Sequence, residues 1–172
     1  MATNGDVASG IEQTVWRIDP ARSSVEFEVP HAWGLTRVKG EFDRYDGTLD
    51  LRSKPAIKLM VNADSINTNN KKRDKHLRSD DFFDVEGHPL VHFTSDTATL
   101  DDGRLTLTGT LRAAGASEPL QLVATLRQAG PELEIEATAD VDQRRLGMTY
   151  NFMGMIRTPA KLVVRGRLVL DT

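Results

Sequence analysis

The segment that decides the fold runs from Ile66 to Phe93 and reads INTNNKKRDKHLRSDDFFDVEGHPLVHF. It opens with a polar run, residues 67–75, and leads to the aromatic pair Phe82 and Phe83, which stands among aspartates. Burying a phenylalanine stabilises a fold by roughly 1.5–3 kcal/mol, so this pair is too apolar to be left in water. We therefore interpret the segment as a short helical excursion, around residues 69–84, that covers the open end of an apolar cavity.

Most of the remaining sequence alternates between apolar and polar residues, which is typical of strands with one buried face and one wet face. Parallel strands covered by helices would show continuous apolar runs, so the alternation predicts an antiparallel sheet. The run at 132–141 has ten residues and would span about 33 Å, which favours an elongated barrel over a compact sandwich. Regular turn signals such as Asp101-Asp102-Gly103 complete the pattern. The sequence therefore predicts an all-β fold, an extended antiparallel barrel of eight strands.

The inward positions of these strands carry mainly Val, Leu, Ile, Ala and Gly. Side chains of this size can leave the interior of an eight-stranded barrel open for one small ligand, or they can fill it completely. The alternation by itself favours neither arrangement, so both remain open at this point.

Composition excludes several classes of protein. The length of 172 residues predicts one domain, at 13–172, and the net charge of −3 argues against a nucleic-acid partner. No run approaches the roughly 18 apolar residues of a membrane-spanning helix, and the absence of cysteine excludes a Cys-ligated zinc site and a thiolate nucleophile. Residues 1–12 are small and polar, which predicts a disordered tail. No secretory signal is visible there, so we expect a cytoplasmic protein, or a periplasmic or secreted one if an export signal was removed.

The chain resembles the YceI-like family. The resemblance covers most of the chain and rests on motifs that occur in the same order. The matching segments are WRIDP at 16–20, VEFEVPH at 25–31, VKGEF at 38–42, RDKHLRSDDFFDV at 73–85 and LTGTL at 107–111. The chain departs from the family pattern at Arg22, at 143–148 and in the Met-rich stretch 150–156.

The resemblance implies a lipocalin-like barrel that holds a polyisoprenoid or another long-chain lipid, such as a fatty-acyl chain, without a cofactor. It also implies that two copies can pair as a homodimer. A ligand site in such a lumen is expected to use the inward or capping side chains of Phe27, Val29, His31, Trp33, Phe42, Leu59, Leu77, Phe82, Phe83, Phe93, Leu107, Leu122, Phe152 and Met153.

Metal and catalytic roles find little support in the sequence. His88 and His92 would lie about 13 Å apart along a strand, too far for one ion. The acids Asp80, Asp81 and Asp84 lack a partner motif for catalysis, and we interpret them as capping a short helix. We therefore predict neither a metal site nor a catalytic residue.

Three functions remain in order of preference. The first is a non-enzymatic protein that binds a long apolar chain in its lumen, for carriage, storage or a stress response. The second is an enzyme or enzyme accessory that acts on a lipid-like substrate, with His31 or an acid near the mouth as the polar group. The third is a filled barrel that serves as an interaction module.

Overall fold

The structure is a computed structural model that describes residues 14–31, 35–148 and 159–172. Strands dominate it, and the one α-helix among these residues is α2, Lys71–Arg78. The strands are β1 (Val15–Ile18), β2 (Ser24–His31), β3 (Thr36–Phe42), β4 (Tyr45–Asp50), β5 (Ala56–Asn62), β6 (Ile66–Asn67), β7 (Leu90–Asp101), β8 (Arg104–Ala113), β9 (Ala116–Ala129), β10 (Glu132–Val141) and β11 (Ala160–Leu170). Short 3-10 turns, η1 (Pro20–Arg22), η3 (Ala63–Ser65) and η4 (Gln143–Leu146), connect some of them.

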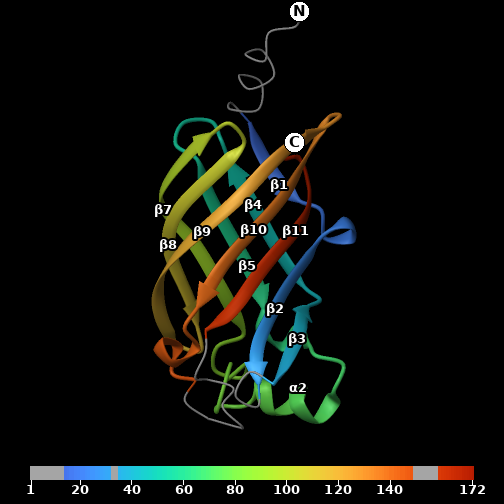
Figure 1. The fold of residues 1–172 in the computed structure, drawn as a ribbon, viewed down its shortest axis with the longest axis vertical. Coiled ribbons are helices and arrows are strands. Elements are labelled where there is room, and N and C mark those ends of the chain that lie inside the picture. Colours follow the sequence, from blue (N-terminus) through green and yellow to red (C-terminus); the bar gives the residue numbers. More distant parts are fainter. Residues whose placement is uncertain (1–13, 32–34, 149–158) are drawn as a thin grey trace, which may run out of the picture.

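These strands form a closed antiparallel barrel of eight long strands, as predicted. β1 and β2 act as one strand bent at η1, and β3 and β4 act as a second bent strand that pairs with the first. The sheet then runs through β5, β7, β8, β9, β10 and β11. β11 pairs with both β1 and β2, which closes the barrel (Figure 1).

The bend between β1 and β2 is fixed by a local cap and by a close approach of two strands. Asp19 accepts a hydrogen bond from the backbone N–H of Ala21, and Pro20 begins the turn with its φ already restricted. Ser23 then lies directly against Gly166 of β11, where an added Cβ would overlap the Ser23 side chain. The Ser23 hydroxyl accepts a hydrogen bond from the N–H of Arg167. Glycine at 166 is therefore required for β2 to cross β11 at this distance.

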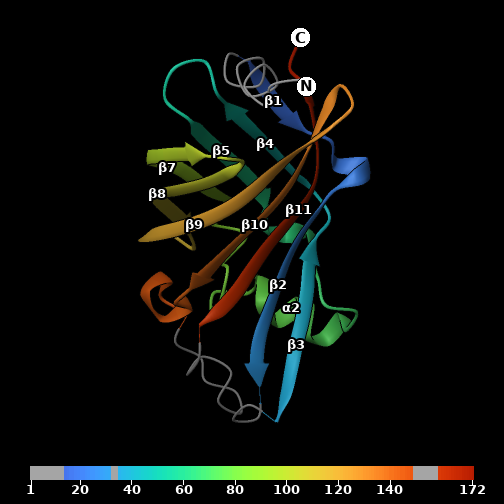
Figure 2. The same ribbon diagram turned by 45° about the horizontal axis from the view of Figure 1, so that its top comes forward.

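The barrel wall is incomplete at one end, and the decisive segment of the sequence lies there. On the side away from β2, the one strand in the described ranges that pairs with β3 is the two-residue β6, through Glu41 and Phe42. The chain from η3 to Pro89, which contains α2, occupies this side between β3 and β7 (Figures 1 and 2). The prediction of a helical excursion near 69–84 that covers an end of the barrel is confirmed.

The core follows the alternation that the sequence shows. Leu105, Leu107 and Leu133 are completely buried, and every second residue along β8, β9 and β10 faces the interior. The outer face of β10 carries glutamates, and Arg22, Arg127 and Arg167 pair with them. Exposed ion pairs of this kind add little stability individually, so the inward apolar face is what holds the barrel together.

Candidate ligand-binding cavity

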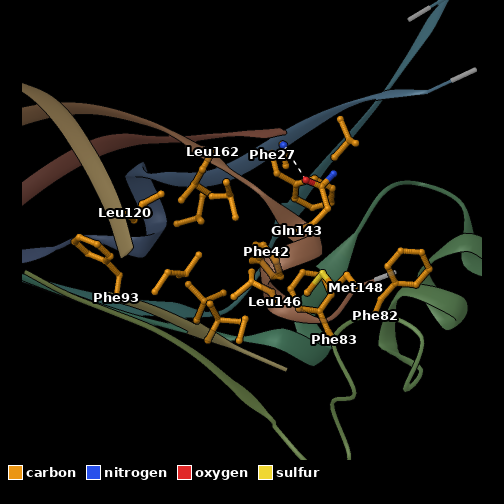
Figure 3. A pocket seen from close by; sticks show the side chains of 18 of the residues that line it. Phe27, Phe42, Phe82, Phe83, Phe93, Leu120, Gln143, Leu146, Met148 and Leu162 are labelled. Atoms are coloured by element: carbon orange, nitrogen blue, oxygen red, sulfur yellow. Dashed lines mark hydrogen bonds between the residues drawn. The ribbon is translucent and has the colours of Figure 1, made fainter. Parts of the chain in front are cut away.

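An apolar cavity of about 130 Å³ lies inside the barrel at the end that α2 covers. Its wall comes from strands on all sides, from the segment that follows α2, and from η4 (Figure 3). The residues that line it are Val25, Phe27, Val29, Val38, Phe42, Leu59, Val61, Leu77, Phe82, Phe83, Val91, Phe93, Leu111, Ala113, Leu120, Leu122, Val141, Gln143, Leu146, Met148, Ala160 and Leu162. Gln143 is the one polar residue among them. The interior is therefore neither packed solid nor an open tube.

Phenylalanine rings occupy the part of the lumen nearest the cap. The rings of Phe27 and Phe42 have centroids 5.7 Å apart, and Phe83 meets Phe42 edge-on at the same distance. Edge-to-face contacts of this kind are favourable for aromatic pairs. Phe27 and Phe83 are only partly buried, whereas Phe42 is buried. The rings thus form part of the cavity wall, and two of the three are still partly exposed.

A buried polar clamp holds α2 in place. Asp74 is 6% exposed, and its Oδ1 accepts hydrogen bonds from the backbone N–H of Thr68, at 2.9 Å, and from the Thr68 hydroxyl, at 2.5 Å. Arg73 donates to the hydroxyl and to the carbonyl oxygen of Thr68. Arg78 donates to the carbonyl of Ile66 at the other end of the helix. These bonds attach both ends of α2 to the chain at β6, so they position the cap and do not point into the cavity.

The chain after α2 turns so that two phenylalanines meet the cavity. Asn70 caps the start of the helix through its side chain, and Ser79 ends it, with its hydroxyl on the carbonyl of His76. The N–H of Phe83 then bonds to the carbonyl of Leu77, which folds the turn back on the helix. His76 packs edge-on against Phe82 and hydrogen-bonds Asp81. The prediction that the acids Asp80, Asp81 and Asp84 cap a short helix is wrong, because α2 ends at Arg78 and residues 80–83 form a turn, in which Asp81 bonds the ring of His76.

Another part of the wall is η4, which lies at the same end of the barrel as α2 (Figure 1) and which two side chains attach to the barrel. Glu118 of β9 accepts a hydrogen bond from the N–H of Asp142, at 3.3 Å, and Gln143 accepts one from the N–H of Ala160, at 3.2 Å. Glu118 is buried, and this burial raises the pKa of its carboxyl above the usual value. Asp142 is held ionised, because Arg144 hydrogen-bonds its carboxylate and lowers its pKa.

A family model described as the YceI-like domain matches residues 16–168. The chain belongs to the YceI-like family. Among curated relatives, Protein YceI of Escherichia coli O157:H7 is 37% identical over 106 residues, which is 59% of this chain and 55% of that protein. A UPF0312 protein of Pectobacterium atrosepticum is 35% identical over the same length. The matched region therefore spans about half the length of these relatives.

Solved structures show the same fold at low identity. BcnA of Burkholderia cenocepacia superposes with a TM-score of 0.78 at 15% identity, covering 90% of this chain and 99% of that one. A polyisoprenoid-binding domain from Saccharophagus degradans gives 0.70 at 14% identity, with coverage of 92% and 99%. The YceI protein of Campylobacter jejuni gives 0.72 at 22% identity, with coverage of 80% and 87%.

The structure brings most of the predicted site residues of this YceI-like chain together. Nine of them line the cavity, namely Phe27, Val29, Phe42, Leu59, Leu77, Phe82, Phe83, Phe93 and Leu122. Leu107 is buried opposite Leu122 in the β8–β9 ladder, but it does not line the cavity. Alternation indicates the inward face of a strand and not the depth along the barrel, which explains this difference. Trp33, Phe152 and Met153 lie outside the described residues, as does the side chain of His31. Ligand contact by any of these residues stays a prediction.

Sequence reasoning missed the part of the wall that η4 supplies. Gln143, Leu146 and Met148 line the cavity, although the stretch 143–148 carries no alternation. A usable signal was present, because Leu146 and Met148 are apolar residues in an otherwise polar turn. Across residues 14–31, 35–148 and 159–172, no group of three His, Asp or Glu side chains is arranged to hold a metal ion. No helix in the same ranges is long and apolar enough to cross a membrane.

Proposed function

We propose that this protein binds the apolar chain of an isoprenoid, or of a similar long-chain lipid, inside the barrel and shields it from water. The observation that carries the proposal is a cavity whose wall, as far as the described residues form it, is apolar except for Gln143. Apolar pockets with few polar groups are the usual form of a small-molecule site. The fold is also that of a structure described as a polyisoprenoid-binding domain, which supports the same class of ligand.

The size of the cavity limits how much of a chain it holds without rearrangement. A cavity of about 150 Å³ holds a benzene ring, so one of about 130 Å³ takes close to six carbons. At ~0.8 kcal/mol for each buried CH₂, six carbons contribute roughly 5 kcal/mol before the costs of association. Micromolar affinity requires roughly 8 kcal/mol, or about ten carbons.

A longer chain therefore needs additional space, and the phenylalanine cluster supplies it in this proposal. Phe27 and Phe83 are partly buried, so their rings can turn toward solvent at lower cost than the fully buried side chains elsewhere in the wall. The bound chain then runs from the cavity past these rings to the end of the barrel near α2. Binding by this route grows with chain length until the lumen is filled.

The test compares a substitution inside the lumen with one on the outer face of the same strand. Leu162 lines the cavity, whereas its neighbour Lys161 is exposed. Delipidated wild-type, Leu162→Trp and Lys161→Trp proteins are mixed with geranyl, farnesyl and geranylgeranyl methyl ethers, and complexes are detected by native mass spectrometry. The indole ring occupies the space of a ring-sized group, so Leu162→Trp should bind none of the ethers.

Lys161→Trp should bind like the wild type, with affinity rising along the series. Thermal unfolding of both variants checks that the barrel is intact. Absence of binding to wild-type protein, or equal binding by the two variants, would show that the lumen is not the site.

A further inference from the structure

Glu118 has a buried carboxyl group, and only one of its two oxygens accepts a hydrogen bond from the described residues. Glu118 lies on β9, on the same inward face as Leu120 and Leu122, and is 5% exposed. Its Oε1 accepts the bond from the N–H of Asp142, whereas its Oε2 is buried and has no hydrogen-bond partner within the described parts of the chain. Buried polar atoms are nearly always paired, and a carboxylate oxygen without a donor is especially costly. A single bond to Asp142 therefore does not explain a carboxylate at this position.

The position of Glu118 relates it to the cavity. In the β8–β9 ladder it stands directly opposite Leu111, and side chains at such paired positions lie on the same face, with Cβ atoms about 5 Å apart. Leu111, Leu120 and Gln143 all line the cavity. Glu118 thus lies at the margin of the cavity, next to lining residues of its own strand, of β8 and of η4.

We propose that Glu118 is the polar end of the ligand site and selects an apolar ligand whose head carries a hydroxyl group, as an alcohol or a phenol does. The inference rests on the proposed function and adds the chemistry of the head. The hydroxyl donates to Oε2, which supplies the donor that the described parts of the chain lack. The ligand reaches this oxygen by displacing the side chain of Leu111 or Leu120 at the margin.

The charges around Glu118 favour a neutral head. A phosphate or carboxylate head would face Glu118 and the ionised carboxylate of Asp142, and the arginines that act on these acids, Arg144 and Arg145, already offset their charge. An ammonium head would lose its hydration and gain only Oε2 of Glu118 among the acceptors described here, because Arg144 already pairs with both oxygens of the Asp142 carboxylate. A hydroxyl is uncharged, needs one acceptor, and loses the least hydration among these heads.

The experiment compares two ligands with the same apolar body. Delipidated protein is titrated with farnesol and with farnesyl methyl ether, which lacks the donor. Wild-type protein should bind farnesol about ten-fold more tightly, since a hydrogen bond to a charged acceptor is worth about that factor. In Glu118→Leu the two ligands should bind equally, whatever the loss of the η4 attachment costs the binding of both. Glu118→Gln keeps an acceptor oxygen and should retain part of the preference.

A control variant and three outcomes distinguish recognition of the head by Glu118 from a purely structural role of this residue. Gln121→Leu, on the outer face of β9, should keep the full preference of the wild type. If Glu118 only attaches η4, Glu118→Leu should weaken the binding of both ligands by the same factor and keep the preference of the wild type for farnesol, which overturns the inference. Equal binding of the two ligands by wild-type protein overturns it as well, while the proposed function stands. Binding of neither ligand by wild-type protein overturns both.

Discussion

Replacing Asp74 with alanine should destabilise the barrel strongly, although the residue lies on the surface helix α2. The substitution leaves the buried N–H of Thr68 without an acceptor and removes a charged acceptor from the Thr68 hydroxyl. An orphaned buried donor costs about 1–3 kcal/mol, and a lost bond to a charged group costs a similar amount. We expect a total loss of about 3 kcal/mol.

That loss converts to a shift that thermal unfolding detects readily. In a protein of this size, each kcal/mol corresponds to roughly 2–4 °C in the melting temperature, so Asp74→Ala should melt roughly 6–12 °C lower. Asp74→Asn keeps an acceptor at the same place and should lose about 1 kcal/mol. Asp80→Ala, at an exposed position two residues past the helix, should change stability by less than about 0.5 kcal/mol.

Circular dichroism at 218 nm, followed on heating, measures all three variants under one condition. A melting temperature of Asp74→Ala within about 2 °C of the wild type would refute the argument that this carboxylate holds the cap. An equal loss in Asp80→Ala would refute it too, because that result would point to the charge of the segment and not to the buried clamp.

Three further predictions concern other parts of the barrel. Gly109→Ala should lower the free energy of unfolding, measured by chemical denaturation, by about 2 kcal/mol or more, because the added Cβ would overlap the carbonyl oxygen of Thr94. An unchanged free energy of unfolding would show that the two strands do not approach this closely at Gly109. The pKa of Asp50 is about 2, because Arg52 hydrogen-bonds its carboxylate. It should return toward the ordinary value in Arg52→Ala, as measured by NMR titration. In the wild type, the pair of Asp50 and Arg52 stabilises the folded state at pH values above the ordinary pKa of an aspartate, and this stabilisation is lost as the pH falls toward 2. The pKa of Glu118 is raised, so the native state holds its proton more tightly and stability falls as the pH rises past the ordinary pKa. Glu118→Gln should therefore melt higher than the wild type near pH 7 and equally near pH 4, and a difference that persists at pH 4 would argue against burial as the cause.

The sequence predicted those elements whose structure depends on local pattern. The alternation over 132–141 matches β10, which runs from Glu132 to Val141, and the polar excursion matches α2. Both follow from which side chains one face must bury, and this is readable residue by residue.

Features that depend on how neighbouring segments pack on one another were not predictable in this way. Helix spacing predicts an i, i+4 pair between Asp74 and Arg78. Instead, Asp74 bonds Thr68, and Arg78 bonds backbone carbonyls of the segment before the helix. Gln143 enters the cavity wall because Ala160, at the start of β11, offers it an N–H. Neither partner is indicated by periodicity, since each contact joins an element to a neighbouring turn or strand that packs on it only in the folded chain.

The closing strand β1 has a further consequence for self-association. Its four residues satisfy the backbone groups of β4 on one side and of β11 on the other. A polypeptide cut just before Pro20 would therefore present two unpaired strand edges at once, and exposed edges of this kind recruit strands from other molecules. We expect such a fragment to form swapped dimers or aggregates, whereas a synthetic peptide of residues 14–19, added in excess, should restore the monomer.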